Sequence, residues 1–369
     1  MNYPMGAADV GPRLTGLGRP AIWHMDPDTR TPYAMAWNLS IQRQLSDTMS
    51  WEIGYVGNGS RKVSLYNTAN MQRRDTGLRA TDLMPELGGI GGFRMIDDAD
   101  STTYHALQTE FKKRFSNYNT FNVYYDWSNN ISYFGGDLFR GDRIQDWDLV
   151  DSRHSRLDLE RGPTRHRIRH RFVMDHIVEL PFDKWANSPG SRAFLGGWTI
   201  GGIWQWMSGE GGDGFLIAQG GPGGGRKQRP DFICGSHQEA FDTAQPGNLF
   251  NPDCFSMVGI NSVGQFDRPG NFSRYPWEYP RRFKWDLSLA KKTQLGEEMG
   301  LEIRADLINA FNNVAISRSR TGPGSCSAGN VGTAYNPLDE PGCKRAGNFG
   351  NIRSLTNSRS IQLNMRLTF

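Results

Sequence analysis

Three features of this sequence predict an all-β fold, an antiparallel transmembrane β-barrel with long extracellular loops. The last eleven residues alternate apolar and polar side chains, segments with the same alternation recur along the chain, and the connections between these segments are short and long in turn. Side chains of a strand point alternately to the two faces of a sheet, so each segment has one apolar and one polar face. We count nine segments and expect a partial barrel, about nine to ten strands of a larger one.

The C-terminal segment, residues 359–369, has the most regular alternation. A tilted strand needs about 9–11 residues to cross a bilayer, and a terminal aromatic residue suits the girdle at the membrane interface. Taken alone, this pattern fits an edge strand of a soluble β-sandwich equally well. The apolar phase consists of Ile361, Leu363, Met365, Leu367 and Phe369.

Eight further segments show the same period of two, with charged residues recurring on the polar phase. In the first of them, Leu39 and Ile41 alternate with Ser40 and Gln42. A membrane barrel and a sandwich both accommodate such strands, so the order of the loops has to decide between them. The segments span residues 37–45, 51–55, 107–115, 121–127, 172–180, 200–206 (the most ambiguous), 285–289 and 301–311.

The connections between the segments alternate in length throughout the chain. Outer-membrane barrels have short periplasmic turns and longer extracellular loops, whereas a sandwich has no reason to produce this order. The alternation therefore favours the barrel. Short or middling connections are expected at 46–48, 116–119, 181–197 and 296–298, and long ones at 59–101, 128–164, 208–282 and 313–357.

This topology predicts how the chain is placed in the membrane. If the long loops are extracellular, residues 1–33, which show no strand pattern, are the tail of an extracellular loop. Residues 34–369 then form the C-terminal part of an outer-membrane β-barrel. A complete single-chain bacterial barrel has an even number of strands, and the chain begins without the pattern of a signal peptide. We therefore expect a piece of a larger barrel protein.

Composition narrows the class of protein further. The mean hydropathy is −0.59. No stretch approaches 18 consecutive apolar residues, which excludes helical membrane spans but not barrel strands. The net charge of +4 is too small and too dispersed to indicate a nucleic-acid partner. The aromatic content of 12% and the 44 glycines suit barrel girdles and long loops.

Short motifs distributed over residues 34–369 resemble the Oar-like TonB-dependent outer-membrane receptors. The resemblance implies a 22-stranded barrel preceded by a plug domain and a regulatory-like sandwich domain. The plug, the energy-coupling box and the signal sequence have no counterpart in this chain. The motifs lie at residues 37–45, 52–57, 107–108, 113–115, 125–128, 161–163, 170–172, 179–182, 286–289 with 291, 304–306, 311–312 and 367–369.

The resemblance also assigns a role to the terminal strand. It implies that the barrel-assembly machinery recognises the alternating apolar residues and the final aromatic residue. The expected barrel-assembly signal is therefore Ile361, Leu363, Met365, Leu367 and Phe369.

The four cysteines lie in pairs within two predicted external loops, Cys234 with Cys254 and Cys326 with Cys343. Even numbers in loops are typical of an oxidising compartment. We expect two local disulfides, each worth about 3 kcal/mol in the chain-entropy model for a loop of roughly 20 residues. Four unpaired buried thiols are the alternative.

Other constellations do not support a ligand site. His166 and His170 have the spacing of helical zinc ligands but lie among arginines, and the glycine-rich run at 220–227 lacks the Gly-Lys-Ser/Thr ending of a phosphate loop. Asp142, Asp146, Asp148 and Asp151 do not follow a known calcium-loop spacing. The sequence therefore predicts no catalytic residue, no metal and no cofactor, and we do not expect an enzyme.

The function expected is part of a TonB-dependent receptor in the outer membrane of a Gram-negative bacterium. It would take up a large nutrient (an oligosaccharide, a peptide or a chelate), with the loops as the external capture surface. The alternative is a non-transporting surface protein, an adhesin or a structural layer component. The expected partners are outer-membrane lipid, the barrel-assembly machinery, an unknown extracellular ligand and, through a preceding part of the protein, the energy-coupling protein.

Overall fold

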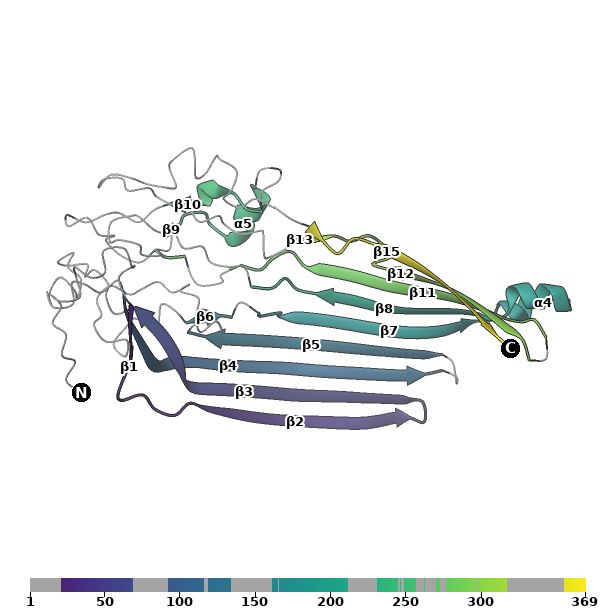
Figure 1. Ribbon diagram of the computed structural model, residues 1–369, viewed down its shortest axis with the longest axis horizontal. Helices are drawn as coiled ribbons and strands as arrows, with labels where there is room; N and C mark the ends of the chain where they lie inside the picture. Colours follow the sequence, from purple (N-terminus) through teal and green to yellow (C-terminus); the bar gives the residue numbers. More distant parts are fainter. Residues whose placement is uncertain are drawn as a thin grey trace, which may run out of the picture.

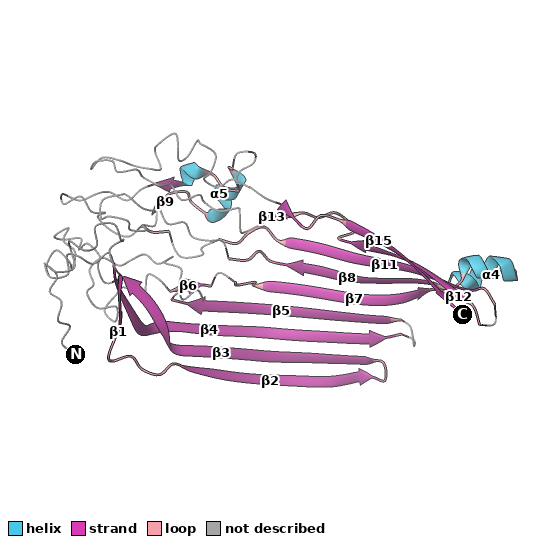
Figure 2. Ribbon diagram, in the orientation of Figure 1, coloured by secondary structure: helices cyan, strands magenta, loops and turns pink. Residues whose placement is uncertain are grey.

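In the structure, a computed structural model, most of the described residues form strands (Figure 2). No helix of the described residues is both long and apolar enough to cross a membrane. The described residues are 21–68, 92–115, 119–133, 161–164, 166–211, 231–244, 246, 249–256, 262, 270–272, 277–296, 298–316 and 355–369.

Nine long strands form one antiparallel sheet in which each strand pairs with its neighbours in chain order (Figure 1). This sequential arrangement confirms the predicted all-β antiparallel fold, and the nine strands correspond to the nine segments with alternating side chains. They are β2 (Tyr33–Ser46), β3 (Met49–Thr68), β4 (Gly92–Arg114), β5 (Thr120–Ser132), β7 (His170–Leu180), β8 (Trp198–Met207), β11 (Arg282–Gln294), β12 (Gly300–Ile308) and β15 (Ser360–Thr368).

The short strands and helices lie at the two ends of this sheet (Figure 1). Strands β1 (Ala21–Met25) and β6 (Gly162–Pro163) join the sheet beside its main path. Two separate pairs are formed by β9 (Asp231–Phe232) with β10 (Phe255–Ser256) and by β13 (Ala315–Ile316) with β14 (Leu355–Thr356). The helices are η4 (Phe182–Trp185), α4 (Pro189–Leu195), α5 (His237–Asp242) and η5 (Pro252–Cys254).

The alternating apolar residues are in phase across the whole sheet. Leu39 of β2 pairs with Tyr55, Tyr55 pairs with Leu107, and Leu107 pairs with Trp127 of β5. On the other side of the sheet, Leu307 of β12 pairs with both Leu287 and Ile361. Directly opposed residues of neighbouring strands share a face. The sheet therefore has one apolar face and one polar face over its full width.

The two ends of the sheet differ in their connections. At one end β2 turns into β3 through Asp47 and Thr48, and β11 turns into β12 over residues 295–299. At this turn end the backbone N–H of Leu295 donates a 2.8 Å hydrogen bond to the carbonyl of Met299. The strand ends joined by the long connections, and the chain's first described strand, lie at the opposite end, the loop end (Figure 1). The predicted order of short and long connections is confirmed.

Two expectations about strand boundaries were wrong. The predicted loop at 59–101 is shorter, because β3 continues to Thr68 and β4 begins at Gly92. Register shifts between Ser60 and Val63 and between Val63 and Leu65 break the period of two that would have shown these extensions in the sequence. The strand expected to reach Phe311 ends at Ile308, because Asn309 adopts a positive φ of 53° and turns the chain.

A strand was also not expected before residue 34. Strand β1 pairs in parallel with the extension of β4, with Ala21 opposite Gly92 and Met25 opposite Ile96. Five residues are too few to establish a period of two, and the pairing partner lies far away in the sequence. The sequence therefore carried no readable signal for β1.

The sheet is open, with β2 and β15 at its two edges. Because each neighbouring pair is antiparallel and the path has nine strands, both edge strands run in the same direction, from the loop end to the turn end. Direct pairing of the two edges would therefore be parallel. An antiparallel closure needs an odd number of further strands between them.

Candidate functional site

The polar face of the sheet carries closely spaced ionic and hydrogen-bonding pairs. Lys112 Nζ lies 2.8 Å from Glu110 Oε1, and Lys284 Nζ lies 2.6 Å from Asp286 Oδ2. Asn122 donates a 2.8 Å hydrogen bond to Asp175. Paired charges on half-exposed strands are tolerable only where water reaches them. This face is therefore suited to a solvated interior.

Asp306 collects three donors on the polar face near the C-terminal edge. Its carboxylate accepts hydrogen bonds from Ser288 Oγ at 2.7 Å, from Arg304 Nε at 3.0 Å and from Asn364 Nδ2 at 3.1 Å. These donors come from β11, β12 and β15. One carboxylate thus ties the polar residues of three neighbouring strands together.

A trough of about 520 Å³ lies on the polar face over β2 to β7. Three acidic residues belong to its lining, and Arg171 is the one cation among the described lining residues. Asp126 lies opposite Arg171 in the strand register. The trough can offer both acceptors and a cation to a polar solute. Its polar lining includes Asn38, Ser40, Glu52, Gln108, Glu110, Tyr124, Asp126 and Arg171.

At the loop end a charge network joins the segments around β7, β8 and β11. Arg167 Nη2 lies 2.9 Å from Glu278 Oε1, and Arg169 Nε lies 3.5 Å from the same oxygen. Arg282 pairs with Glu210 at 3.1 Å. Burial lowers the pKa of Arg167, while the Glu278 carboxylate acts in the opposite direction. Glu278 thereby holds a buried guanidinium at the base of the loops.

Above this network the described part of the β8–β11 connection forms an aromatic module with a core of its own. We use this name for residues 231–244, 246, 249–256, 270–272 and 277–279. Phe272 is fully buried, and its ring lies 5.2 Å from Phe255 and 6.0 Å from Phe232. Trp277 packs on Tyr279 at 4.7 Å between ring centroids. The buried core consists of Ala240, Leu249, Phe250, Cys254, Phe255, Phe272, Trp277 and Tyr279.

A disulfide and a capped helix hold the aromatic module together. The Sγ atoms of Cys234 and Cys254 lie at bonding distance, 2.06 Å, and the bond closes a sequence separation of 20. Ser236 caps α5, accepting from the backbone N–H of Glu239 at 3.1 Å. Aromatic residues supply the apolar area that this short segment needs for a core. The module is an ordered surface and not merely a connection.

We expect the double substitution Cys234→Ser, Cys254→Ser to lower the free energy of unfolding of the aromatic module by about 3 kcal/mol, because it releases the closed loop. Limited proteolysis of the inserted barrel measures this change, with the exposed Gln238→Ala as the control. Mass spectrometry of unreduced peptides checks both predicted pairings. Equal protease resistance in the serine variant, or free thiols at positions 234 and 254, would contradict the prediction.

The aromatic module is also expected to weaken in acid. The ring of His237 lies 4.8 Å from Phe232 and 6.0 Å from Phe272, and burial lowers its pKa from the ordinary 6.5. The unfolded segment therefore takes up a proton first as the pH falls below about 6.5. The stability that the neutral His237 contributes to the aromatic module is present in full above this pH. It is lost as the pH falls toward the lower pKa of the folded state.

The measurement is protease resistance of the inserted barrel between pH 7.5 and pH 5. His237→Phe should remove the pH dependence, whereas His166→Asn, at an exposed position outside the module, should keep it. An identical pH profile in wild type and His237→Phe would show that this imidazole is not the titrating group.

The structure places the other residues singled out in the sequence as follows. His170 opens β7, where its Nδ1 lies 2.8 Å from the hydroxyl of Tyr125, so a hydrogen bond occupies the ring nitrogen. No group of three or more metal-ligating side chains occurs among the described residues. The residues Cys326, Cys343, Asp142, Asp146, Asp148, Asp151 and 220–227 lie outside the described residues.

The proposed assembly signal lies along one edge of the sheet. Its four strand residues occupy the apolar face of β15, where Leu363 pairs with Ala305 and Leu367 with Leu301. All five side chains are exposed, and Phe369 is the most exposed, at 93%. An exposed apolar row on an edge strand is the surface that another strand or lipid can cover.

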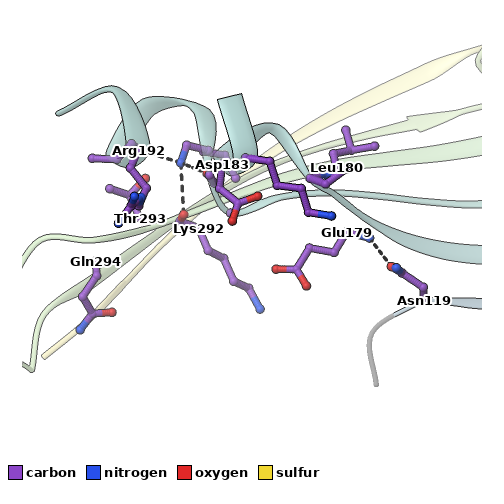
Figure 3. A pocket seen from close by; sticks show the side chains of 14 residues that line it. Asn119, Glu179, Leu180, Asp183, Arg192, Lys292, Thr293 and Gln294 are labelled. Atoms are coloured by element: carbon purple, nitrogen blue, oxygen red, sulfur yellow. Dashed lines mark hydrogen bonds between the residues drawn. The ribbon is translucent and has the colours of Figure 1, made fainter. Parts of the chain in front are cut away.

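A second groove, of about 640 Å³, lies at the turn end between α4 and the ends of β7 and β11. Figure 3 shows Arg192 on the helix and the side chains of Lys292 and Gln294 directed away from it. No sequence pattern predicted this groove, because α4 lies inside a connection that we expected to be a middling turn.

The in-phase apolar face, the charged opposite face and the two unlike ends define a wall of a transmembrane β-barrel. The sequence matches the family model described as "Outer membrane beta barrel domain" over residues 3–362, and the chain belongs to that family. It is thus an outer-membrane protein whose apolar face meets lipid. No match was found among the curated proteins.

Solved structures that are similar to this chain include two outer-membrane transporters. The outer membrane transporter YddB from Escherichia coli has a TM-score of 0.41 and 10% identity, covering 95% of this chain and 34% of that one. The FrpB iron transporter from Neisseria meningitidis (F3-3 variant) has a TM-score of 0.40 and 12% identity, covering 95% and 33%. The chain spans about a third of the length of each transporter.

Proposed function

We propose that this chain forms the C-terminal part of the barrel of a TonB-dependent outer-membrane receptor that takes up a large nutrient. The observation that carries the proposal is the polar face, which bears charged pairs and belongs to a nine-stranded sheet that remains open. A sheet of this width that needs further strands encloses a wide interior. A polar interior of that size suits the passage of an oligosaccharide, a peptide or a chelate.

The aromatic module supports the proposal from the loop end. Ligand-binding residues are concentrated on loops that a rigid scaffold positions. Here a disulfide and an aromatic core order part of a long connection, and the Arg167–Glu278 pair attaches it near the ends of the strands. An ordered module beside the mouth of the barrel can contact a solute before it enters.

Uptake by cells that carry the full-length parent gene tests this proposal. A deletion strain is supplied with labelled oligosaccharides, peptides and metal chelates, with and without a protonophore. The expected result is loss of uptake of one of these classes, restoration by the wild-type gene, and abolition by the protonophore. Unchanged uptake of every class in the deletion strain would overturn the proposal.

A matched pair of variants separates the interior from the lipid surface. Arg171→Gln removes the cation of the trough, and Phe172→Leu changes the next residue, which lies on the apolar face. We expect the first variant to raise the half-saturating solute concentration and the second to leave it unchanged. Loss of attachment to surfaces by the deletion strain, with normal uptake, would instead favour the alternative, an adhesin.

A further inference from the structure

The connection between β7 and β8 contains η4 and α4 and is attached to the apolar face of the sheet. Trp198 and Lys291 are partners in the register on that face. The indole N–H of Trp198 donates to the carbonyl of Phe194 at 3.0 Å. Lys291 Nζ donates to the carbonyl of Ala193 at 2.8 Å and to that of Gly196. Because these donors lie on the apolar face, α4 lies on the side of the sheet that meets lipid.

Lys292, which follows Lys291, is independent evidence that α4 lies on the apolar side of the sheet. Lys292 belongs to the polar face of β11, and its side chain points away from α4 (Figure 3). The backbone N–H of Lys292 donates to the carbonyl of Gly197 at 2.9 Å. Gly197 has a φ of 71°, and a Cβ there would lie 2.2 Å from the carbonyl oxygen of Lys292. A glycine at this point therefore allows the connection to close tightly onto the sheet.

The same connection exposes two large aromatic side chains. Trp185 is 69% exposed and Phe194 is 73% exposed, although the ring of Trp185 stacks on Phe182 at 5.3 Å. Phe194 adjoins the sheet through Trp198, which is in register with Leu180 and, through Lys291, with Ile303. Trp185 lies in the segment that directly follows Leu180 at the end of this row. The exposed aromatic surface is thus continuous with the surface that meets the membrane core.

Cations lie close to these aromatic residues in the sequence, where Lys184 precedes Trp185 and Arg192 lies two residues before Phe194. Both cations also line the turn-end groove, together with Glu179 and Lys292. Lys184 and Arg192 are exposed, Lys291 lies beneath the C-terminus of α4, and Asp183 is the one carboxylate of the connection itself. Tryptophan prefers the membrane–water interface, and lysine and arginine near it attract anionic lipid headgroups. The charges come from side chains, so they do not depend on the dipole of a short helix.

We propose that the connection Pro181–Gly197 is an interfacial anchor that binds phospholipids of the periplasmic leaflet. Trp185 and Phe194 insert at the level of the headgroups, and Lys184 and Arg192 contact the lipid phosphates. Phospholipid is the expected ligand because the aromatic surface is continuous with the lipid-facing sheet and because the connection has an excess of positive charge. The anchor rests on the outer-membrane fold and does not require the proposed transport function.

Fluorescence quenching by brominated lipid tests the position of Trp185. The full-length protein is reconstituted in vesicles of phosphatidylethanolamine and phosphatidylglycerol that carry bromine near the glycerol end of the acyl chain. The contribution of Trp185 to the fluorescence is the difference between wild type and Trp185→Leu. This contribution should be quenched strongly by brominated lipid and little by soluble acrylamide. The component lost in Trp277→Phe, in the aromatic module, should not be quenched by the lipid.

Lipid binding by the cations is measured separately by native mass spectrometry with phosphatidylglycerol. Removing one charge near an anionic surface is expected to weaken binding by about fivefold, so Lys184→Gln with Arg192→Gln should lower it well over tenfold. Lys284→Gln, on the polar face near the other end of β11, is the matched control and should bind as wild type. Soluble glycerol phosphate should not compete, since it lacks the acyl chains.

Four results would overturn the anchor. A Trp185 component quenched by acrylamide but not by brominated lipid would place the residue in water. A component protected from both quenchers would show that a second copy or another protein covers the connection. Equal phosphatidylglycerol binding by the double glutamine variant and wild type, or full competition by glycerol phosphate, would remove the lipid-phosphate contact.

Discussion

Replacing Leu287 by arginine is expected to lower the stability of the inserted barrel by about 2–4 kcal/mol, the range for an arginine facing lipid near the midplane. Leu287 lies in the middle of β11, where it pairs with Gly202 on one side and Leu307 on the other. Its side chain belongs to the apolar face, and an arginine there has no water and no partner. Unfolding in urea of the protein in lipid vesicles measures the loss.

Ser288→Arg is the matched control, one residue further along the same strand. Ser288 lies on the polar face, and its hydroxyl donates to Asp306 at 2.7 Å. An arginine at this position meets a carboxylate in a solvated interior, so we expect a much smaller change. Equal losses at the two positions would contradict the assignment of the two faces.

The terminal strand gives the second large effect. Deleting Phe369 in the full-length parent is expected to lower the amount of protein inserted in the outer membrane while synthesis stays unchanged. Phe369 ends the apolar row of the unpaired edge strand, and an unpaired edge in lipid costs several kcal/mol per backbone group until it is sealed. Heat modifiability in outer-membrane fractions measures insertion.

Two companion variants sharpen this prediction. Phe369→Tyr keeps an aromatic residue at the interface and should insert normally. Leu367→Arg should add a penalty below the 2–4 kcal/mol expected at the midplane, because Leu367 lies two residues from the end of the chain. Wild-type insertion by the Phe369 deletion would show that the terminal residue has no role in assembly.

The sheet could be predicted because its signal is local and repeated. A strand with one face toward lipid and one toward water must alternate, and a shift by one residue would reverse both faces. The structure brings the segments of Leu39, Tyr55 and Leu107 into a register that keeps their apolar residues on one face. The pairing of Cys234 with Cys254 needed only the spacing of the cysteines within one loop.

The aromatic module could not be predicted, because its core is assembled from distant positions without a period. Phe232, Phe255 and Phe272 meet in three dimensions, but no regular spacing relates them. The density of aromatic residues in this loop was the available signal. The attachment of α4 was equally hidden, since it depends on Lys291 and Trp198 from different strands.

The central claim is that the sheet crosses the outer membrane with its loop end outside and its turn end in the periplasm. Cysteine labelling in intact cells tests it most directly. Thr31→Cys, at the exposed loop end before β2, and Asp47→Cys, in the turn after β2, are introduced separately into the full-length parent and treated with a membrane-impermeant maleimide. We expect labelling at position 31 in intact cells, and labelling at position 47 only after the outer membrane is permeabilised. Labelling of both positions in intact cells, or of position 47 alone, would contradict the account.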